Sequence, residues 1–184
     1  MKIRQIILSV FLVFLFGCND PVPKPNAMLR LDYPNALYED LNTDCPYTFQ
    51  KNQKTVLNEG EKCQLQIQYP FMKATLHLTY RGVSNNLDSL LRDAQKLTYE
   101  HVVKADDISE QPFLNDKSKV YGMLYQVGGN AASQAQFYAT DSTKHFLTGA
   151  LYFYAKPNYD SILPAVSYLE KDIRVLMESL QWKN

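Results

Sequence analysis

The spacing of hydrophobic residues changes partway along this chain, from every second position to every third or fourth. In residues 64–69 and 74–81 apolar and polar side chains alternate, as they do in strands with one buried face. Between residues 86 and 104 the apolar residues recur with the period of a helix. Because neither pattern suits the other structure, the chain must combine strands with helices.

The two alternating stretches also predict which side chains are buried. We expect one face to point into the core: Leu65, Ile67, Tyr69, Ala74, Leu76, Leu78 and Tyr80. We expect the other face of the second stretch to point outward: Thr75, His77 and Thr79.

Further stretches complete the predicted order of elements. Strands are predicted at residues 28–33, 47–50, 120–127, 134–140 and 145–155, and a second helix at about 160–180. The last strand carries large apolar groups on both faces, so it should be central and covered on both sides. In the second helix we expect Asp160 or Ser161 as the N-cap and Pro164 in the first turn.

The expected architecture is an α+β fold, an antiparallel β-sheet with two main packed helices. Short turns between successive strands favour antiparallel pairing. Hydrophobic residues make up 46% of the 184, enough to build a core in one domain over residues 28–184. The order of elements is similar to that of the Mog1/PsbP-like sandwich.

The N-terminus predicts export and lipidation. Lys2 and Arg4 precede an apolar run, residues 6–16, which is shorter than the roughly 20 residues of a membrane span and is typical of a signal peptide. The run ends in Leu-Phe-Gly-Cys, which resembles the lipobox of bacterial lipoproteins except for the large residue Phe16. We therefore expect residues 1–17 to be removed and Cys18 to be lipidated. The alternative is an ordinary signal peptide with an incidental cysteine.

Residues 18–27 are expected to be a tether between the lipid and the domain. Pro21, Pro23 and Pro25 stand at alternate positions, which favours an extended polyproline II segment. At about 3.1 Å per residue, this segment could hold the domain up to about 28 Å from the lipid surface.

Two cysteines remain in the folded part, Cys45 and Cys63. An even pair in an exported chain favours a disulfide. Two free thiols are the first alternative. A metal or redox pair is the second, although the pair lacks CxxC spacing and nearby histidine ligands.

Composition and motifs argue against several functions. Lys plus Arg total 19 and Asp plus Glu total 19, so the chain lacks the positive charge on which nucleic-acid binding depends. The sequence contains no phosphate-binding glycine motif, no GxSxG and no HExxH. We therefore expect no enzymatic activity, no metal and no cofactor.

Two alternatives stay open. Glu100, His101 and Asp106 could act in a hydrolase if they converge, although a helix C-terminus with solvated neighbours is the simpler and favoured explanation. A second alternative is a platform for a glycan or small ligand, made by the tyrosines of the later strands or, more simply, packed under helices: Tyr121, Tyr125, Tyr138, Tyr152 and Tyr154.

The chain resembles the gliding motility lipoprotein GldD family. The most specific run, residues 84–101, reads SNNLDSLLRDAQKLTYEH and continues as KADDI over 104–108. Shorter matches are PKP at 23–25, YP at 33–34, CP at 45–46, MKAT at 72–75 and PNYDS at 157–161.

The resemblance implies a role in the envelope apparatus for gliding and type IX secretion, and it supplies no catalytic residues. We expect a subunit that is anchored to the outer membrane, faces the periplasm and binds other envelope proteins of that machinery. The expected partner-binding residues come from the specific run: Asn85, Asn86, Asp88, Arg92, Asp93, Lys96, Glu100, Lys104, Asp106 and Asp107.

Overall fold

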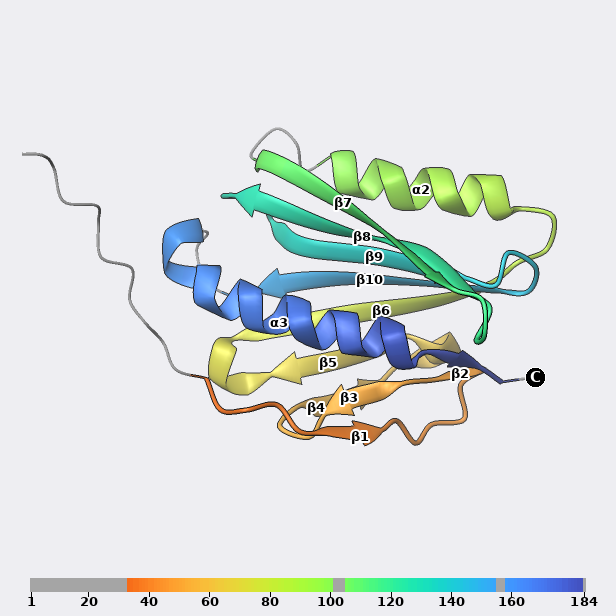
Figure 1. Cartoon of the computed structure of the whole chain (residues 1–184), viewed down its shortest axis with the longest axis horizontal. Coiled ribbons are helices and arrows are strands. Elements are labelled where there is room, and N and C mark those ends of the chain that lie inside the picture. Colours follow the sequence, from red (N-terminus) through yellow and green to blue (C-terminus); the bar gives the residue numbers. More distant parts are fainter. Residues whose placement is uncertain (1–32, 101–104, 155–157, 184) are drawn as a thin grey trace, which may run out of the picture.

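A seven-stranded antiparallel sheet forms the centre of the protein, here seen in a computed structural model that describes residues 33–100, 105–154 and 158–183. The strand order is β4-β5-β6-β10-β9-β8-β7 (Figure 1). These strands span Val56–Glu59, Leu65–Tyr69, Ala74–Gly82, Ala105–Asn115, Val120–Gly129, Ser133–Thr140 and His145–Phe153, numbered β4 to β10. The predicted α+β class is confirmed.

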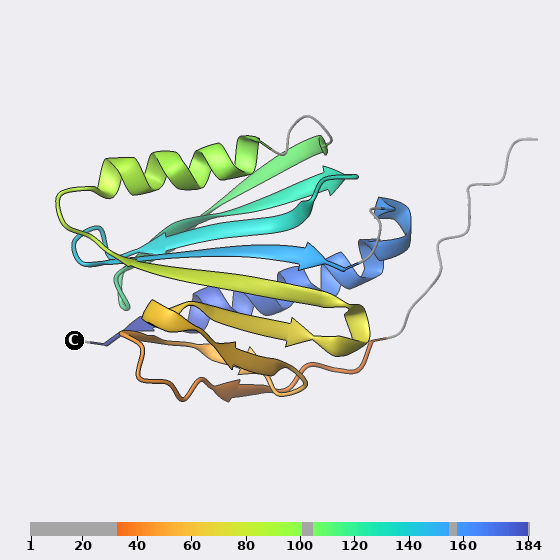
Figure 2. The same ribbon diagram turned by 180° about the vertical axis from the view of Figure 1, so that it is seen from behind.

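Two helices pack on opposite faces of this sheet. Helix α3, Tyr159–Ser179, crosses in front of the sheet in Figure 1 and behind it in Figure 2. It buries Leu169, Ile173 and Leu176 in the same core as the apolar faces of β5, β6, β9 and β10. Helix α2, Leu87–Tyr99, lies on the other face near the β7–β9 edge (Figure 2). It leaves the β6 side of that face uncovered.

Strand β10 is central, as predicted, since three strands flank it on each side. Leu147 and Leu151 point toward α3 and are fully buried. Phe146 and Ala150 alternate with them on the opposite face, where Phe146 stacks on Tyr138. Both faces of this strand are thus covered over most of its length.

The N-terminal part of the described chain forms two small sheets beside the large one. Strand β1, Tyr38–Asp40, pairs with β3, Gln50–Asn52. Strand β2, Tyr47–Thr48, pairs with the C-terminal β11, Gln181–Trp182. The segment predicted as one strand over 47–50 is therefore two strands, because each half pairs with a different partner.

A buried carboxylate joins the β1–β3 sheet to α3. Asp172 accepts hydrogen bonds from the Tyr38 hydroxyl at 2.7 Å and from Asn52 Nδ2 at 2.9 Å. Burial raises the pKa of Asp172, although hydrogen bonds from Asn52, Tyr38 and Tyr69 oppose the rise. The charge is costly to bury, so these donors are needed to hold it there.

Both predicted helices differ from the structure at their ends. Helix α2 ends at Tyr99, and β7 begins at Ala105, so the prediction of a helix up to residue 104 is too long. In α3 the N-cap is Asn158, because its carbonyl accepts from the next turn and starts the helix earlier than expected. Pro164 consequently lies in the second turn, where its ring removes one helical hydrogen bond.

Other strand predictions need smaller corrections. Residues 28–32 of the expected first strand lie outside the described residues, and Tyr33 belongs to no strand. Strand β10 ends at Phe153, and residue 155 is not among those described. Thr75 is fully buried rather than outward, and its neighbours in the register are Gln68 of β5 and Tyr152 of β10.

Candidate functional site

The outer face of α2 is the largest part of the predicted partner-binding set. We use this name for its exposed charged side chains: Asp88, Arg92, Asp93, Lys96 and Glu100. Lys96 pairs with Glu100 at 3.7 Å and Asp93 with Arg81 of β6 at 3.8 Å. No carboxylate of the described residues lies within 4.0 Å of the Arg92 guanidinium.

Two asparagines precede this helix. Asn86 is the N-cap residue, but its side chain accepts from the Ser84 N–H at 2.7 Å instead of capping the first turn. Asn85 has a φ of 55°, a left-handed conformation that asparagine tolerates better than most residues. Both side chains are exposed and lie next to the outer face of α2.

The acidic pair Asp106 and Asp107, which we expected just beyond the end of the helix, lies in strand β7. An irregularity in the pairing with β8 falls between Ala105 and Ile108. Asp107 lies against Gly128 so closely that a Cβ there would meet the carboxylate at 2.0 Å. Both residues are nevertheless exposed, at the start of an edge strand and past the C-terminal end of α2. Lys104 and Cys18 lie outside the described residues.

A cavity of about 290 Å³ lies on the inner side of α2, against β6, β8, β9 and β10. Its wall includes Gln136, which is 3% exposed. The Gln136 Oε1 accepts from the Thr98 hydroxyl at 3.3 Å, whereas its Nε2 has no hydrogen-bond partner. Sequence reasoning missed this residue because a glutamine in an alternating strand resembles a solvent-facing one. The one signal in the sequence was the apolar stripe of α2, which indicates that this helix packs on the sheet face that carries Gln136.

Three of the five predicted tyrosines line this cavity: Tyr125, Tyr138 and Tyr152. Tyr125 is buried, which, with nearby Tyr138, Glu110 and Tyr99, raises the pKa of its hydroxyl to about 12. The structure places the other two, Tyr121 and Tyr154, outside the cavity wall. The tyrosines thus form part of a pocket and not a flat platform.

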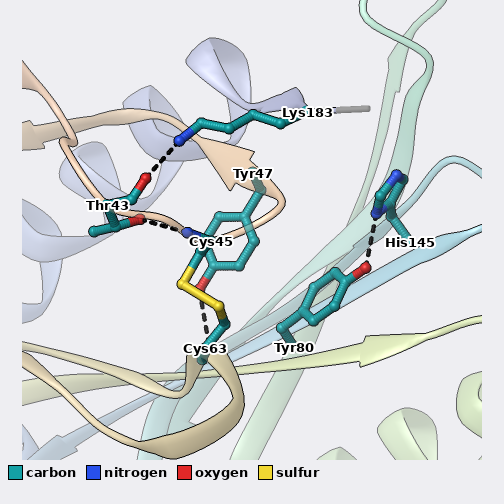
Figure 3. The surroundings of a disulfide bond; sticks show 7 residues. All are labelled: Thr43, Cys45, Tyr47, Cys63, Tyr80, His145 and Lys183. Carbon is teal, nitrogen blue, oxygen red and sulfur yellow. Dashed lines mark hydrogen bonds between the residues drawn. A yellow bond between two sulfur atoms is a disulfide. The ribbon is translucent and has the colours of Figure 1, made fainter.

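The predicted disulfide between Cys45 and Cys63 is present, with 5.5 Å between the two Cα atoms (Figure 3). The Tyr47 hydroxyl donates to the Cys63 carbonyl at 3.0 Å. On the other side, the Lys183 ammonium donates to the Thr43 carbonyl at 2.6 Å. The disulfide therefore joins the segment just before β2 to the 3-10 turn, Glu61–Cys63, that precedes β5.

A histidine near this disulfide, His145, is held in place by packing and by a hydrogen bond. His145 is buried, hydrogen-bonds the Tyr80 hydroxyl through Nδ1 at 2.8 Å (Figure 3) and stacks on Trp182 with ring centroids 5.0 Å apart. Burial lowers the pKa of this imidazole. The ring therefore packs on the C-terminal strand β11, and one of its nitrogens is engaged by Tyr80.

The structure brings together no hydrolase constellation in the residues that it describes. Glu100 is paired with Lys96, Asp106 packs on β8, and His101 falls outside those residues. Among residues 33–100, 105–154 and 158–183, no group of three or more His, Cys, Asp or Glu is arranged to hold a metal ion. No helix in these ranges combines the length and apolarity needed to cross a bilayer.

The antiparallel sheet, helix α2 and the disulfide define a disulfide-stabilised α+β domain, and disulfides are typical of proteins in oxidising compartments. The sequence model of the family described as "Gliding motility lipoprotein GldD" matches residues 18–182, and the chain belongs to this family. The match begins at Cys18, the residue predicted to be lipidated. No curated protein matches the chain.

Proposed function

We propose that this gliding motility lipoprotein is a non-enzymatic subunit that binds another envelope protein of the gliding and type IX secretion apparatus through the outer face of α2. The observation that carries the proposal is the surface of this helix. Its charged side chains are exposed together with one large aromatic side chain, Tyr99, at 50%. Protein interfaces combine such aromatic groups with a polar rim.

The charges of this face favour a protein partner with a complementary pattern. Arg92 has no ion-pair partner among the described side chains, so a carboxylate of the partner could pair with it at no cost to an existing pair. The two ion pairs that do exist are well exposed and are worth little to the free domain. They could exchange partners easily on binding.

The proposed location is the periplasmic side of the outer membrane, with the acyl chains on Cys18 as anchor. Residues 18–27 would let the domain reach about 28 Å from the lipid surface if they are extended. This distance lets α2 meet a partner in the periplasm while the lipid stays in the membrane.

The test is a pull-down of the lipidated protein from crosslinked envelopes, compared with the Arg92→Glu, Lys96→Glu double variant. We expect one envelope protein to be enriched by the native chain and lost with the variant. The matched control, Lys54→Glu with Lys171→Glu, makes the same charge change away from α2 and should retain the partner. Equal recovery with both double variants would refute docking through this helix. Circular dichroism checks that α2 survives, since Lys96→Glu also removes an ion pair worth a few tenths of a kcal/mol.

A further inference from the structure

Two aromatic side chains and a lysine are exposed together at one end of the large sheet. We call Phe71, Lys73 and Tyr154 the aromatic corner; they lie where β5 turns into β6 and where β10 ends. Phe71 keeps 47% of its surface exposed and Tyr154 keeps 66%, and Lys73 is exposed as well. Exposed apolar groups that gather at one place mark a contact with another protein or with a membrane.

The backbone holds the aromatic corner together. The 3-10 turn η2, Pro70–Met72, buries Met72 in the core, so Phe71 before it is left on the outer side of the turn. Lys73 follows with a φ of 51°, and its carbonyl accepts from the Tyr154 N–H at 2.7 Å. This hydrogen bond fixes the end of β10 beside the turn. The three side chains therefore belong to one hydrogen-bonded unit and not to separate loops.

The chain enters the domain at this same end. The described part begins at Tyr33, whose ring packs on Tyr168 of α3 with centroids 5.5 Å apart, and Tyr69 at the end of β5 lies near Tyr168 as well. Figures 1 and 2 show this start of the chain, in orange, next to the turn between β5 and β6. Residues 19–32, 14 in all, separate it from Cys18, the residue predicted to be lipidated, and span at most about 50 Å. This end is therefore the part of the fold that is linked most directly to the membrane.

Charge separates the aromatic corner from the rest of this end. No carboxylate of the described residues lies within 4.0 Å of the Lys73 ammonium. Three carboxylates, Asp106, Asp107 and Asp160, lie near the first residue of α3, beside the start of β7. Strand β7 is three places from β10 in the sheet, or about 14 Å at about 4.8 Å per strand. That separation exceeds the screening length of about 8 Å at physiological salt, so Lys73 can meet an anionic surface without strong repulsion from those carboxylates.

A phospholipid surface matches the chemistry of the aromatic corner. Tyrosine side chains lie at the headgroup level of membranes, where the ring is buried and the hydroxyl stays in water. Phe71 adds a fully apolar ring, and Lys73 adds a cation that attracts the lipid phosphates. Because the lipid anchor makes the contact intramolecular, three side chains suffice where they would not hold a free protein. The same anchor favours the membrane over a soluble protein as the occupant of this corner.

We propose that the aromatic corner contacts the headgroup region of the membrane that holds the lipid anchor, and so fixes the orientation of the domain. The contact rests on the anchor described under the proposed function, but it does not require docking through α2. Helix α2 runs roughly parallel to the strands along the molecule (Figure 1). Contact at one end therefore leaves α2 upright on the membrane, with its outer face clear of the lipid and open to a partner.

The test uses the lipidated protein on vesicles of phosphatidylethanolamine and phosphatidylglycerol, with and without bromine atoms on the lipid acyl chains. Bromine quenches the fluorescence of a tryptophan that reaches the boundary between headgroups and acyl chains. We expect the emission added by Phe71→Trp to shift to shorter wavelength and to lose about half of its intensity with brominated lipid. Native Trp182 is the internal control and should not be quenched, because β11 lies next to the C-terminus at the opposite end of the molecule (Figure 1).

The matched control is Leu114→Trp, which replaces another exposed apolar side chain, 76% exposed, near the end of β7 away from the corner. Its added emission should keep its intensity. Tyr154→Trp is a second probe of the corner if Phe71→Trp does not fold, and it should be quenched in the same way. Lys73→Glu, combined with either corner probe, should reduce the quenching, because it turns attraction to the anionic lipid into repulsion.

The outcomes separate this proposal from the anchor and from docking through α2. Flotation with the vesicles shows whether each lipidated variant is bound to the membrane. Bound protein without quenching at the corner, or with equal quenching of Leu114→Trp, would overturn the proposal and leave the anchor and the α2 interface standing. Unchanged quenching with Lys73→Glu would overturn the role of the lysine. Failure of the lipidated chain to float would instead overturn the anchor on which both proposals rest.

Discussion

Removing the disulfide should destabilise the domain by about 3 to 4 kcal/mol. Cys45 and Cys63 are 18 positions apart, and closing a loop of that length restricts the unfolded chain by about 3 kcal/mol at 25 °C in the chain-entropy account. The hydroxyl of Tyr47, a fully buried residue, donates to the Cys63 carbonyl, and loosening this bond adds about 1 kcal/mol. The Cys45→Ala, Cys63→Ala double variant should therefore lose 3 to 4 kcal/mol.

The assay is urea unfolding of residues 18–184 carrying Cys18→Ser, followed by the fluorescence of the single tryptophan, Trp182. With a slope of about 2 kcal/mol per molar urea, the midpoint should fall by about 1.5 to 2 M. The native disulfide reduced with dithiothreitol is the control and should unfold at nearly the same urea concentration as the double variant. A loss below about 1 kcal/mol in both would refute the loop-closure reasoning. A loss in the double variant alone would assign the effect to packing of the sulfur atoms.

Three further changes test other parts of the fold, each by chemical or thermal unfolding. Partial burial acts to raise the pKa of Asp141, but hydrogen bonds from the N–H groups of residues 143, 144 and 145 and from the Thr143 hydroxyl outweigh it and lower the pKa to about 2. Because this pKa is below the ordinary 3.8, the stabilisation from the Asp141 carboxylate is complete above about pH 4 and is lost as the pH falls through 2. Asp141→Ala should cost about 1 to 2 kcal/mol at pH 7, allowing for solvent screening. The variant should also lose less stability than the native protein between about pH 4 and pH 2. The same loss of stability between about pH 4 and pH 2 in the variant and the native protein would contradict this. Gly149→Ala should cost about 1 to 3 kcal/mol, because its Cβ would lie 2.1 Å from the Phe137 ring; a neutral result would mean that the ring moves freely. Tyr38→Phe removes a donor to the buried Asp172 carboxylate and should cost about 1 to 3 kcal/mol, whereas no loss would show that water replaces the hydroxyl.

The sequence predicted the central strands well and the edge of the sheet poorly. Strands β5, β6 and β10 each have at least one buried face, and this burial leaves a clear pattern of apolar residues in the sequence. Strand β7 pairs on one side only and exposes most of its residues, so Asp106, Asp107 and Pro112 are tolerated there and conceal it. Predicting β7 would require knowing that β8 needs a partner.

The candidate site was predicted in part for a similar reason. The charges on the outer face of α2 follow from helix period alone, and they are exposed as expected. The cavity on its inner side depends on how far α2 reaches across the sheet, which no local pattern records. Likewise, the contact of Thr98 with Gln136 joins residues 38 positions apart. Such pairs follow from topology and not from spacing.

The pairing of β11 with β2 has a consequence for how the protein matures. Lys183, next to the end of the chain, donates to the carbonyl of Thr43, 140 residues earlier. A chain synthesised from its N-terminus presents β2 long before β11 follows, and contacts between such distant segments form late and slowly. Until then, Tyr47 and Phe49, both buried in the finished domain, lack their final cover. Folding of the N-terminal part is therefore completed only after β11 is available to pair with β2.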